Sequence, residues 1–152
     1  MVSSGDDSVF LDTNVLIYAN VATAPLHQTA VEAIQQLYEA NIDLWISRQV
    51  LREFIATLTR PQTFVTAQPV EIVVARVQFF EQQFLMAEDG PQVTTKLLEL
   101  LQQIPTGGRQ VHDANIVATM LTAGVNRLLT HNTKDFERFA EFITILPLTV
   151  TP

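Results

Sequence analysis

The chain has 152 residues, of which 47% are hydrophobic and 16% are charged, and this composition predicts a folded globular protein. The net charge of −7 argues against a broad basic face for nucleic acid, although carboxylates that bind divalent cations would themselves contribute to that charge. The absence of cysteine excludes disulfides and thiolate metal sites.

Length and hydropathy patterning predict one domain over residues 1–152, with a core at about 8–147. No apolar run approaches the ~20 residues that a membrane-spanning helix needs. Residues 1–8 are polar and acidic, which is the reverse of a secretory signal. We therefore expect a cytoplasmic protein that has no membrane partner.

In the first half of the chain, short apolar runs alternate with segments of helical periodicity. The run 9–11 leads straight into Asp12 and predicts a buried strand. Asn41 and Pro61 mark the ends of two amphipathic helices. The predicted elements are strands at 9–11 and 43–47 and helices at 14–20, 26–40, 50–58 and 70–82.

The second half repeats this alternation, with Gly124 as a predicted helix C-cap. The predicted elements are strands at 84–86, 127–130 and 142–146, helices at 93–104 and 111–123, and a short helix at 135–139. Strands that alternate with helices predict an α/β fold, with a parallel sheet, right-handed crossovers and helices on both faces. Phe79, Phe80 and Phe84 fit a core or a dimer surface better than a platform for stacking bases.

Asp12 and Asp113 stand out because each adjoins apolar residues that predict burial. Asp12 follows the first strand, where it either caps the next helix or faces the crevice in which ligands bind. Asp113 lies on the same helical stripe as Ile116 and Val117, one turn earlier, although a first-turn acid is also common without any further role. Both residues are candidate site carboxylates.

Two further acids have the same candidate role. Glu53 lies beside the apolar stripe of its helix; the alternative is an exposed acid paired with Arg48, Arg52 or Arg60. Asp135 follows the strand at 127–130 by one loop; the alternative for Asp135, and for Asn132 in the same loop, is a cap or turn. The remaining acids in termini and turns are expected to be solvated: Asp6, Asp7, Glu88 and Asp89.

Convergence of four carboxylates at one sheet edge would create repulsion that a counter-charge must offset. Mg²⁺ and Mn²⁺ prefer oxygen ligands of this kind. The chemistry expected of such a site is metal-assisted hydrolysis of a phosphodiester by an activated water, with 5′-phosphate and 3′-hydroxyl products. A metal-free alternative is an RNase A-like pair formed by His112 and His131, which would yield a cyclic phosphate.

Four blocks of the sequence resemble the signature blocks of PIN-domain nucleases, and in particular of VapC-type toxins from bacterial toxin–antitoxin pairs. They extend over most of the chain in the family's order, and the first, third and fourth are the more specific. The blocks are Leu11-Asp12-Thr13-Asn14-Val15-Leu16-Ile17, residues 47–54 with Glu53, His112-Asp113-Ala114-Asn115-Ile116-Val117-Ala118, and Leu129-Thr130-His131-Asn132-Thr133-Lys134-Asp135-Phe136.

The resemblance implies a PIN-like three-layer α/β/α sandwich with a central, mostly parallel sheet of about five strands. It also implies an Mg²⁺- or Mn²⁺-dependent endoribonuclease that forms homodimers and is silenced by an antitoxin protein. The implied metal ligands and catalytic residues are Asp12, Glu53 and Asp113, with Asp135 as the fourth acid. Whether the site holds one metal or two stays open.

The residues implied to hold these ligands in place are Thr13, Asn14 and Thr130. Asn132 occupies a place that is acidic in some members of the family, so it is either a neutral ligand or a positioning residue. Candidate phosphate contacts at the rim are Arg109, His131, Lys134 and Arg138. The alternative functions are RNA processing without an antitoxin, and a catalytically silent module that binds RNA or protein.

Overall fold

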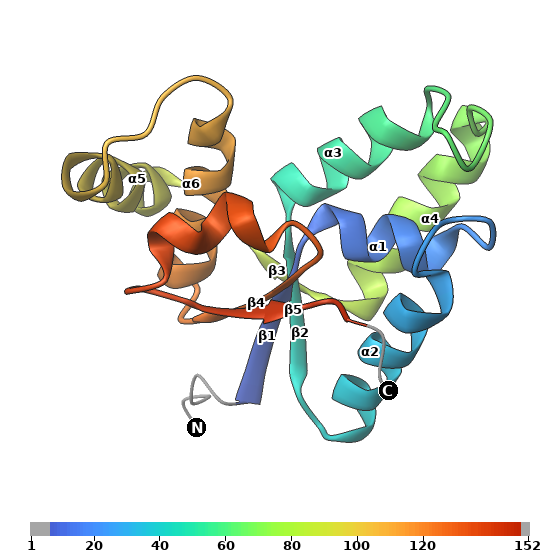
Figure 1. The fold of residues 1–152 in the computed structure, drawn as a ribbon, viewed down its shortest axis with the longest axis horizontal. Coiled ribbons are helices and arrows are strands. Elements are labelled where there is room, and N and C mark those ends of the chain that lie inside the picture. The colour runs from blue at the N-terminus through green and yellow to red at the C-terminus, as the bar shows by residue number, and fades with distance from the viewer. Residues whose placement is uncertain (1–6, 150–152) are drawn as a thin grey trace.

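The computed structural model describes residues 7–149, so most of the polar amino-terminal segment lies outside the described residues. Five strands form one sheet in the order β3-β2-β1-β4-β5, and every neighbouring pair is parallel (Figure 1). The strands are β1 (Ser8–Leu11), β2 (Asp43–Ser47), β3 (Leu85–Ala87), β4 (Arg127–Thr130) and β5 (Thr144–Pro147). The predicted parallel sheet of about five strands is thus confirmed.

The helices form two layers, one on each side of the sheet (Figure 1). The first layer contains α1 (Thr13–Asn20), α2 (His27–Glu39), α3 (Arg48–Leu58) and α4 (Val70–Gln83). The second layer contains α5 (Pro91–Gln103), α6 (Gln110–Thr122) and the 3₁₀-helix η2 (Thr133–Phe139). This is the predicted three-layer α/β/α sandwich. No helix within residues 7–149 is long and apolar enough to cross a membrane.

The middle of the sheet is β1, which is buried along its whole length because helices cover both faces. Its residues pair with β2 on one side, as Val9 does with Leu44, and with β4 on the other, as Phe10 does with Leu128. Phe10 and Leu11 have no exposed surface, which explains why the run is apolar without alternation. The next residue, Asp12, therefore lies directly at the end of a strand in the centre of the core.

The direction of the crossovers reverses at β1. The chain moves from β1 outward to β2 and β3 through the first helix layer, and then returns to β4 and β5 through the second. Right-handed crossovers require the helices to change faces when the direction reverses. The carboxyl ends of β1 and β4 therefore border a topological switch point, which is where open α/β sheets bind ligands.

Several element boundaries differ from the predicted ones because of local hydrogen bonds. The amide of Phe84 bonds to Phe80 O at 2.9 Å and closes α4, so β3 begins one residue later than predicted. The amides of Phe142 and Ile143 both bond to Phe139 O, which delays β5 to Thr144. The predicted short helix at 135–139 is the longer 3₁₀-helix η2.

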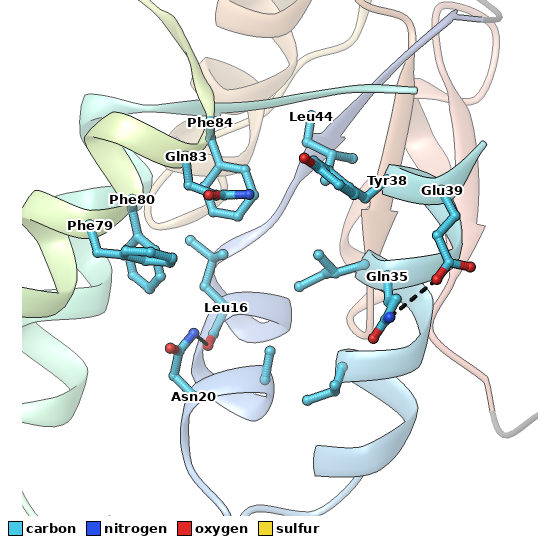
Figure 2. Close-up of a pocket in the computed structure, with 13 residues that line it drawn as sticks. Leu16, Asn20, Gln35, Tyr38, Glu39, Leu44, Phe79, Phe80, Gln83 and Phe84 are labelled. Atoms are coloured by element: carbon cyan, nitrogen blue, oxygen red, sulfur yellow. Dashed lines mark hydrogen bonds between the residues drawn. The ribbon is translucent and has the colours of Figure 1, made fainter. Parts of the chain in front are cut away.

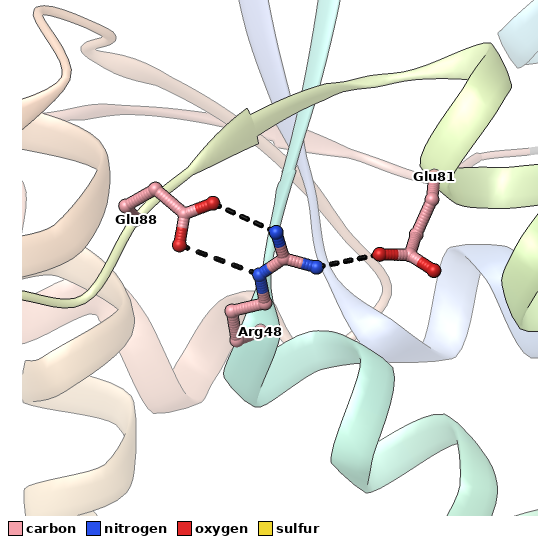
Figure 3. Close-up of polar contacts among 3 residues, drawn as sticks. All are labelled: Arg48, Glu81 and Glu88. Atoms are coloured by element: carbon pink, nitrogen blue, oxygen red, sulfur yellow. Dashed lines mark hydrogen bonds and ion pairs between the residues drawn. The ribbon is translucent and has the colours of Figure 1, made fainter.

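Arg48, at the start of α3, joins two segments that flank β3 (Figure 3). Its guanidinium donates to both carboxylate oxygens of Glu88, at 2.8 and 3.3 Å, and to Glu81 on α4 at 2.7 Å. On the other side of the turn, Asp89 accepts a hydrogen bond from Asn115 Nδ2 at 3.2 Å. Glu88 and Asp89 are exposed to solvent, as predicted, and through these contacts both also fasten the turn after β3.

Candidate active site

The four predicted carboxylates line one cleft of about 350 Å³ at the carboxyl edge of the sheet. Asp12 follows β1, Glu53 projects from α3, Asp113 lies in the first turn of α6, and Asp135 lies in the first turn of η2. Four segments that are far apart in sequence thus contribute one acid each. Their roles as metal ligands and catalytic residues stay predictions.

Asp12 fulfils both readings of its sequence position, because it caps α1 and also lines the cleft. Its side chain is only 5% exposed. One carboxylate oxygen accepts from the Thr13 amide at 2.8 Å, and the other accepts from Thr130 Oγ1 at 2.8 Å and Asn14 Nδ2 at 3.1 Å. A buried carboxylate is costly without such donors, so these three bonds fix its orientation.

The loop after β4 is tied to the same residues. Asn14 Oδ1 accepts from the His131 amide at 2.9 Å, and Thr130 Oγ1 accepts from the Asn132 amide at 3.0 Å. The amide of Asp12 itself donates to Leu129 O at 3.1 Å. The start of α1 and the loop before η2 therefore form one hydrogen-bonded unit around Asp12.

Glu53 is half-buried and bonded inside the cleft. Its oxygens accept from Thr13 Oγ1 and from Gln49 Nε2, each at 2.9 Å. The alternative, an exposed acid paired with an arginine, is wrong: Arg48 is held by Glu81 and Glu88, and the guanidinium groups of Arg52 and Arg60 form no hydrogen bond or ion pair with a described residue.

Gln49 connects Glu53 to the helix that carries Asp113. Its amide nitrogen also donates to His112 O at 2.9 Å, and its amide oxygen accepts from Asn115 Nδ2 at 2.9 Å. The side chain is nearly buried, with 7% exposed. Sequence reasoning missed this residue, although its position one turn before Glu53 on the same helix was an available signal.

The cleft raises the pKa values of two of its acids. Burial raises the pKa of Asp12 to about 6, against the opposing effect of its hydrogen bonds, and the nearby charge of Glu53 adds to the increase. Burial also raises the pKa of Asp113 to about 6, together with the charges of Asp135, Asp12 and Glu53. The carboxylates are therefore close enough for neighbouring charges to oppose the ionisation of Asp12 and Asp113.

The predicted cationic rim is only partly at the cleft. His131 and Lys134 line a hollow that shares Asn132 and Asp135 with the cleft. Arg138 instead donates to Gln110 at 2.7 Å. Its positive charge partly opposes the rise in the pKa of Asp113. Arg109 is exposed at the start of α6 and lines neither of these hollows. Arg60, which the sequence did not single out for this role, lines the cleft itself.

The donor set suits a hard divalent cation, because it consists of carboxylate, amide and hydroxyl oxygens. Among residues 7–149, however, no three acidic or histidine side chains already converge as a compact metal-ligand group. Mg²⁺ does not require such a group, since it keeps several waters and binds proteins through one or two carboxylates together with substrate phosphates. The residues therefore fit Mg²⁺ better than an ion held in an all-protein cage.

The two histidines of the metal-free alternative line different hollows, and neither lines the acid cleft. His112 lies in a hollow beside Glu53, and His131 lies in the hollow beside Asp135. The His131 ring packs edge-on against Tyr18, with ring centroids 5.6 Å apart. The carboxylates, not the histidines, are thus the groups that the fold gathers in one place.

A separate apolar groove lies between α2 and α4, with α1 as its floor (Figure 2). It measures about 460 Å³, and Tyr38 and Phe79 are exposed at its edges, at 63% and 52%. Phe80 is buried and packs against Phe54 with ring centroids 5.0 Å apart. Phe79, Phe80 and Phe84 all line this groove and none lines the acid cleft, so they form no base-stacking platform beside the acids. Whether the exposed ring of Phe79 belongs to a dimer surface stays a prediction.

Fold and cleft together define a three-layer α/β protein with an acidic site at the switch point of its parallel sheet. The chain belongs to the PIN domain family, whose model matches residues 9–142. The predicted membership of this family is thus confirmed. A search of curated protein sequences finds no match.

The chain has the same fold as several solved toxin–antitoxin proteins. A chain of VapBC-1 from nontypeable Haemophilus influenzae is 21% identical, with a TM-score of 0.67 over 94% of this chain and 99% of that one. A chain of VapBC2 from Rickettsia felis, solved with a promoter DNA fragment, is 19% identical, with a TM-score of 0.66 over 92% and 98%. Mycobacterium tuberculosis VapC20, described as a toxin that cleaves the sarcin–ricin loop, is 18% identical, with a TM-score of 0.63 over 91% and 99%.

Proposed function

We propose that this protein is a divalent-metal-dependent endoribonuclease and acts in the cytoplasm as the toxin of a type II toxin–antitoxin pair. The observation that carries the proposal is the cleft at the switch point, which four carboxylates from four segments line. Membership of the PIN domain family supports the same chemistry. The structural similarity to toxin–antitoxin proteins supports the biological role.

In this proposal Asp12, Glu53, Asp113 and Asp135 hold Mg²⁺ or Mn²⁺. The bound cation supplies the Lewis acidity that activates water and neutralises charge on the phosphodiester. Three donors restrain Asp12, so it is the fixed ligand, whereas Asp113 and Asp135 are more exposed and can adjust to the substrate. Thr13 orients Glu53 by donating to its carboxylate.

Asn14 and Thr130 hold Asp12 in orientation, and each also bonds to the loop before η2. Asn132 lines the cleft, and no described residue occupies its side-chain amide, so it is available as a neutral ligand. Lys134 and His131 lie beside Asp135, where they can contact the phosphates of an RNA strand. These contacts position the strand without reading its sequence.

The proposed partner is an antitoxin protein whose apolar side chains fill the groove between α2 and α4. Monomeric proteins rarely leave large aromatic side chains exposed around an apolar hollow without an interaction to serve. Tyr38 and Phe79 do so here. A homodimer of the toxin is also proposed, and light scattering on the purified protein would establish its mass in solution.

The experiment that tests the activity is cleavage of labelled total RNA with Mg²⁺ or Mn²⁺, with EDTA, and by Asp113→Asn. Discrete cuts that need the metal, end in 5′-phosphates and disappear in the variant are expected. Asp43→Asn is the matched control, because Asp43 is an exposed acid at the opposite, amino end of β2. This control variant should cleave like the wild type.

Three other results would each contradict part of the proposal. Cuts that survive EDTA and end in a cyclic phosphate would replace the carboxylate mechanism with one based on His112 and His131. Binding of RNA without any cleavage would indicate a silent binding module. Cleavage by a protein that has no antitoxin encoded beside it would instead indicate RNA processing.

A further inference from the structure

A second hollow of about 420 Å³ adjoins the acid cleft between α3, α5 and α6. Glu53 lines both the cleft and this hollow, so the two are neighbours that share this residue. On the other side of the cleft, Asn132 and Asp135 are shared with the hollow that contains Lys134. The three hollows are therefore neighbours in series along the acids, and we call them together the path.

The unpaired cations of this acidic chain concentrate along that path. Of its nine Lys and Arg residues, four donate hydrogen bonds or form ion pairs: Arg48, Lys96, Arg127 and Arg138. The other five have no such contact with residues 7–149. Three of these five line the path, namely Arg52 in the α3–α5–α6 hollow, Arg60 in the cleft and Lys134 beyond it.

We propose that the α3–α5–α6 hollow is a nucleotide subsite, which receives the base of a single-stranded RNA nucleotide flanking the scissile phosphate while Arg52 contacts its phosphate. This inference rests on the proposed ribonuclease function. A base bound in this way needs apolar surface, a flat stacking partner and a cation near the backbone. Leu97 and Val111 supply the apolar surface, and the His112 ring and Arg52 supply the other two.

The polar groups of the hollow are suited to reading the edge of a base. Gln49 forms the floor, and its amide is already used by Glu53, His112 O and Asn115. The Asn115 amide nitrogen donates to Gln49 and Asp89, but no described residue donates to its oxygen. That oxygen offers one free acceptor to the edge of a base, while Arg52 is used by the phosphate. The subsite therefore gives the enzyme a preference for the base next to the cut.

The first test compares Arg52→Gln with Arg76→Gln in RNA cleavage by the full-length protein. Arg76 is the matched control, because it is also an unpaired arginine but lies away from the path, beside α1 and the end of α3. We expect Arg52→Gln to raise KM by about tenfold with little change in kcat, and Arg76→Gln to have no effect. Only Arg52→Gln should reduce the salt dependence of RNA binding. The slope of log binding constant against log salt concentration should become shallower by about 0.7.

The second test fills the hollow without changing charge. Leu97→Trp is expected to alter which sites in a mixed-sequence RNA are cut. An abasic nucleotide next to the preferred cut should slow wild-type cleavage about tenfold but have little effect on Leu97→Trp. If Leu97→Trp fails to fold, the abasic substrate on the wild-type protein gives the decision.

Equal KM values for Arg52→Gln and Arg76→Gln, or an abasic substrate cut as fast as the intact one, would overturn the subsite while the ribonuclease stands. A wild-type protein that cleaves no RNA with metal would overturn the proposed function and the subsite with it. The two failures are therefore distinguishable from the wild-type reaction alone.

Discussion

At the scale of single residues, the site depends on a conflict at Asp12 between burial and ionisation. Three hydrogen-bond donors favour the charged form of the carboxylate, yet burial still raises its pKa to about 6. A buried acid with a raised pKa, lined up with others in a cleft, is typical of functional sites. The fold thus maintains an arrangement that is unfavourable by itself at neutral pH.

This conflict predicts how stability changes with pH when EDTA keeps the protein free of metal. A carboxyl whose pKa rises from 3.8 to about 6 on folding adds stability below pH 3.8, and that stability is lost as the pH rises through 6. For Asp12 the loss is on the order of 3 kcal/mol, and the half-exposed Asp113 contributes less because water screens it. Urea unfolding at pH 4.5 and 7.5 measures the change.

Asp12→Asn serves as the control, because it removes the titration and should flatten the difference between the two pH values. Excess Mg²⁺ should restore wild-type stability at pH 7.5, since binding to the folded state alone stabilises it. A wild-type protein whose Asp12-dependent stability increases with pH would contradict the raised pKa.

Gln49 allows a second prediction at this scale. Gln49→Leu keeps the side-chain volume but removes the donor to one oxygen of Glu53 and to His112 O, and one of the two acceptors of the Asn115 amide nitrogen. Loss of such a residue behind a metal ligand typically costs about 10–100-fold in metal affinity or activity. Calorimetric titration with Mn²⁺ would measure the affinity directly.

Gln28→Leu is the matched control for Gln49→Leu. Gln28 donates to Glu32 at 3.1 Å across the same four-residue spacing, but on the exposed face of α2. The Gln28→Leu substitution should leave Mn²⁺ affinity unchanged. Equal affinities in both variants would show that Gln49 does not position Glu53.

The sequence identified the four acids of the cleft but not the residues that connect them. Asp12 and Asp113 could be found because a carboxylate beside an apolar stripe is unusual. Gln49 was missed although its four-residue spacing from Glu53 was an available signal. Asn115 could not be found, since a polar residue on a helix is ordinary until the facing helix is known. Similarly, Glu88 and Asp89 look like turn residues, and only the fold shows that Arg48 and Asn115 reach them.

At the scale of elements, α2 and α6 end in the same way. Asn41 and Gly124 adopt left-handed backbone conformations, with φ of 61° and 81°. After α6 the amide of Gly124 bonds to Leu121 O and that of Val125 to Met120 O, the pair of bonds that closes a Schellman motif. This ending turns the chain from α6 into β4, so it places Thr130 opposite Asp12.

Gly124→Ala is expected to lower the free energy of unfolding by about 1 kcal/mol, because an added Cβ disfavours positive φ. Gly107→Ala is the control: its Cβ would also meet open space, and its backbone is not in the left-handed region. It should be neutral or slightly stabilising. Thermal unfolding of both variants would measure the difference, and equal losses would refute the conformational explanation.

Most elements could be predicted because their apolar residues recur with the period of a strand or a helix. The weakest boundaries were those of β3 and β5, the two edge strands. Their residues are partly exposed, so the apolar pattern is faint there. Backbone hydrogen bonds from Phe84 and Phe142 fix these boundaries, and such bonds have no signature in the sequence.

At the scale of the whole molecule, the acid cleft and the apolar groove are separate surfaces that share only the α1 scaffold. Leu16 and Ala19 of α1 line the groove, whereas Thr13 and Asn14 of the same helix line the cleft. A partner that fills the groove therefore packs against the helix that Asp12 caps. We expect partner binding and the geometry of the cleft to be coupled through α1.

The groove can be tested with Phe79→Ser. Removing this exposed ring should weaken copurification with the proposed antitoxin at least tenfold, while the proposed metal-dependent cleavage of RNA by the protein alone is unchanged. Ile72→Ser is the matched control on the same helix: Ile72 is 51% exposed, against 52% for Phe79, and lies outside the groove. Equal weakening by both variants would place the partner elsewhere.

The late position of β4 in the chain has a consequence for the protein while it is being synthesised. Asp12 is held by Leu129 O and by Thr130 Oγ1, and the latter lies 118 residues further along. A nascent chain that has reached α6 already contains three of the four acids, but the strand that orients the first has yet to be made. We therefore expect the growing polypeptide to be harmless to the RNA that encodes it, and its activity to begin only when the sheet closes around β1.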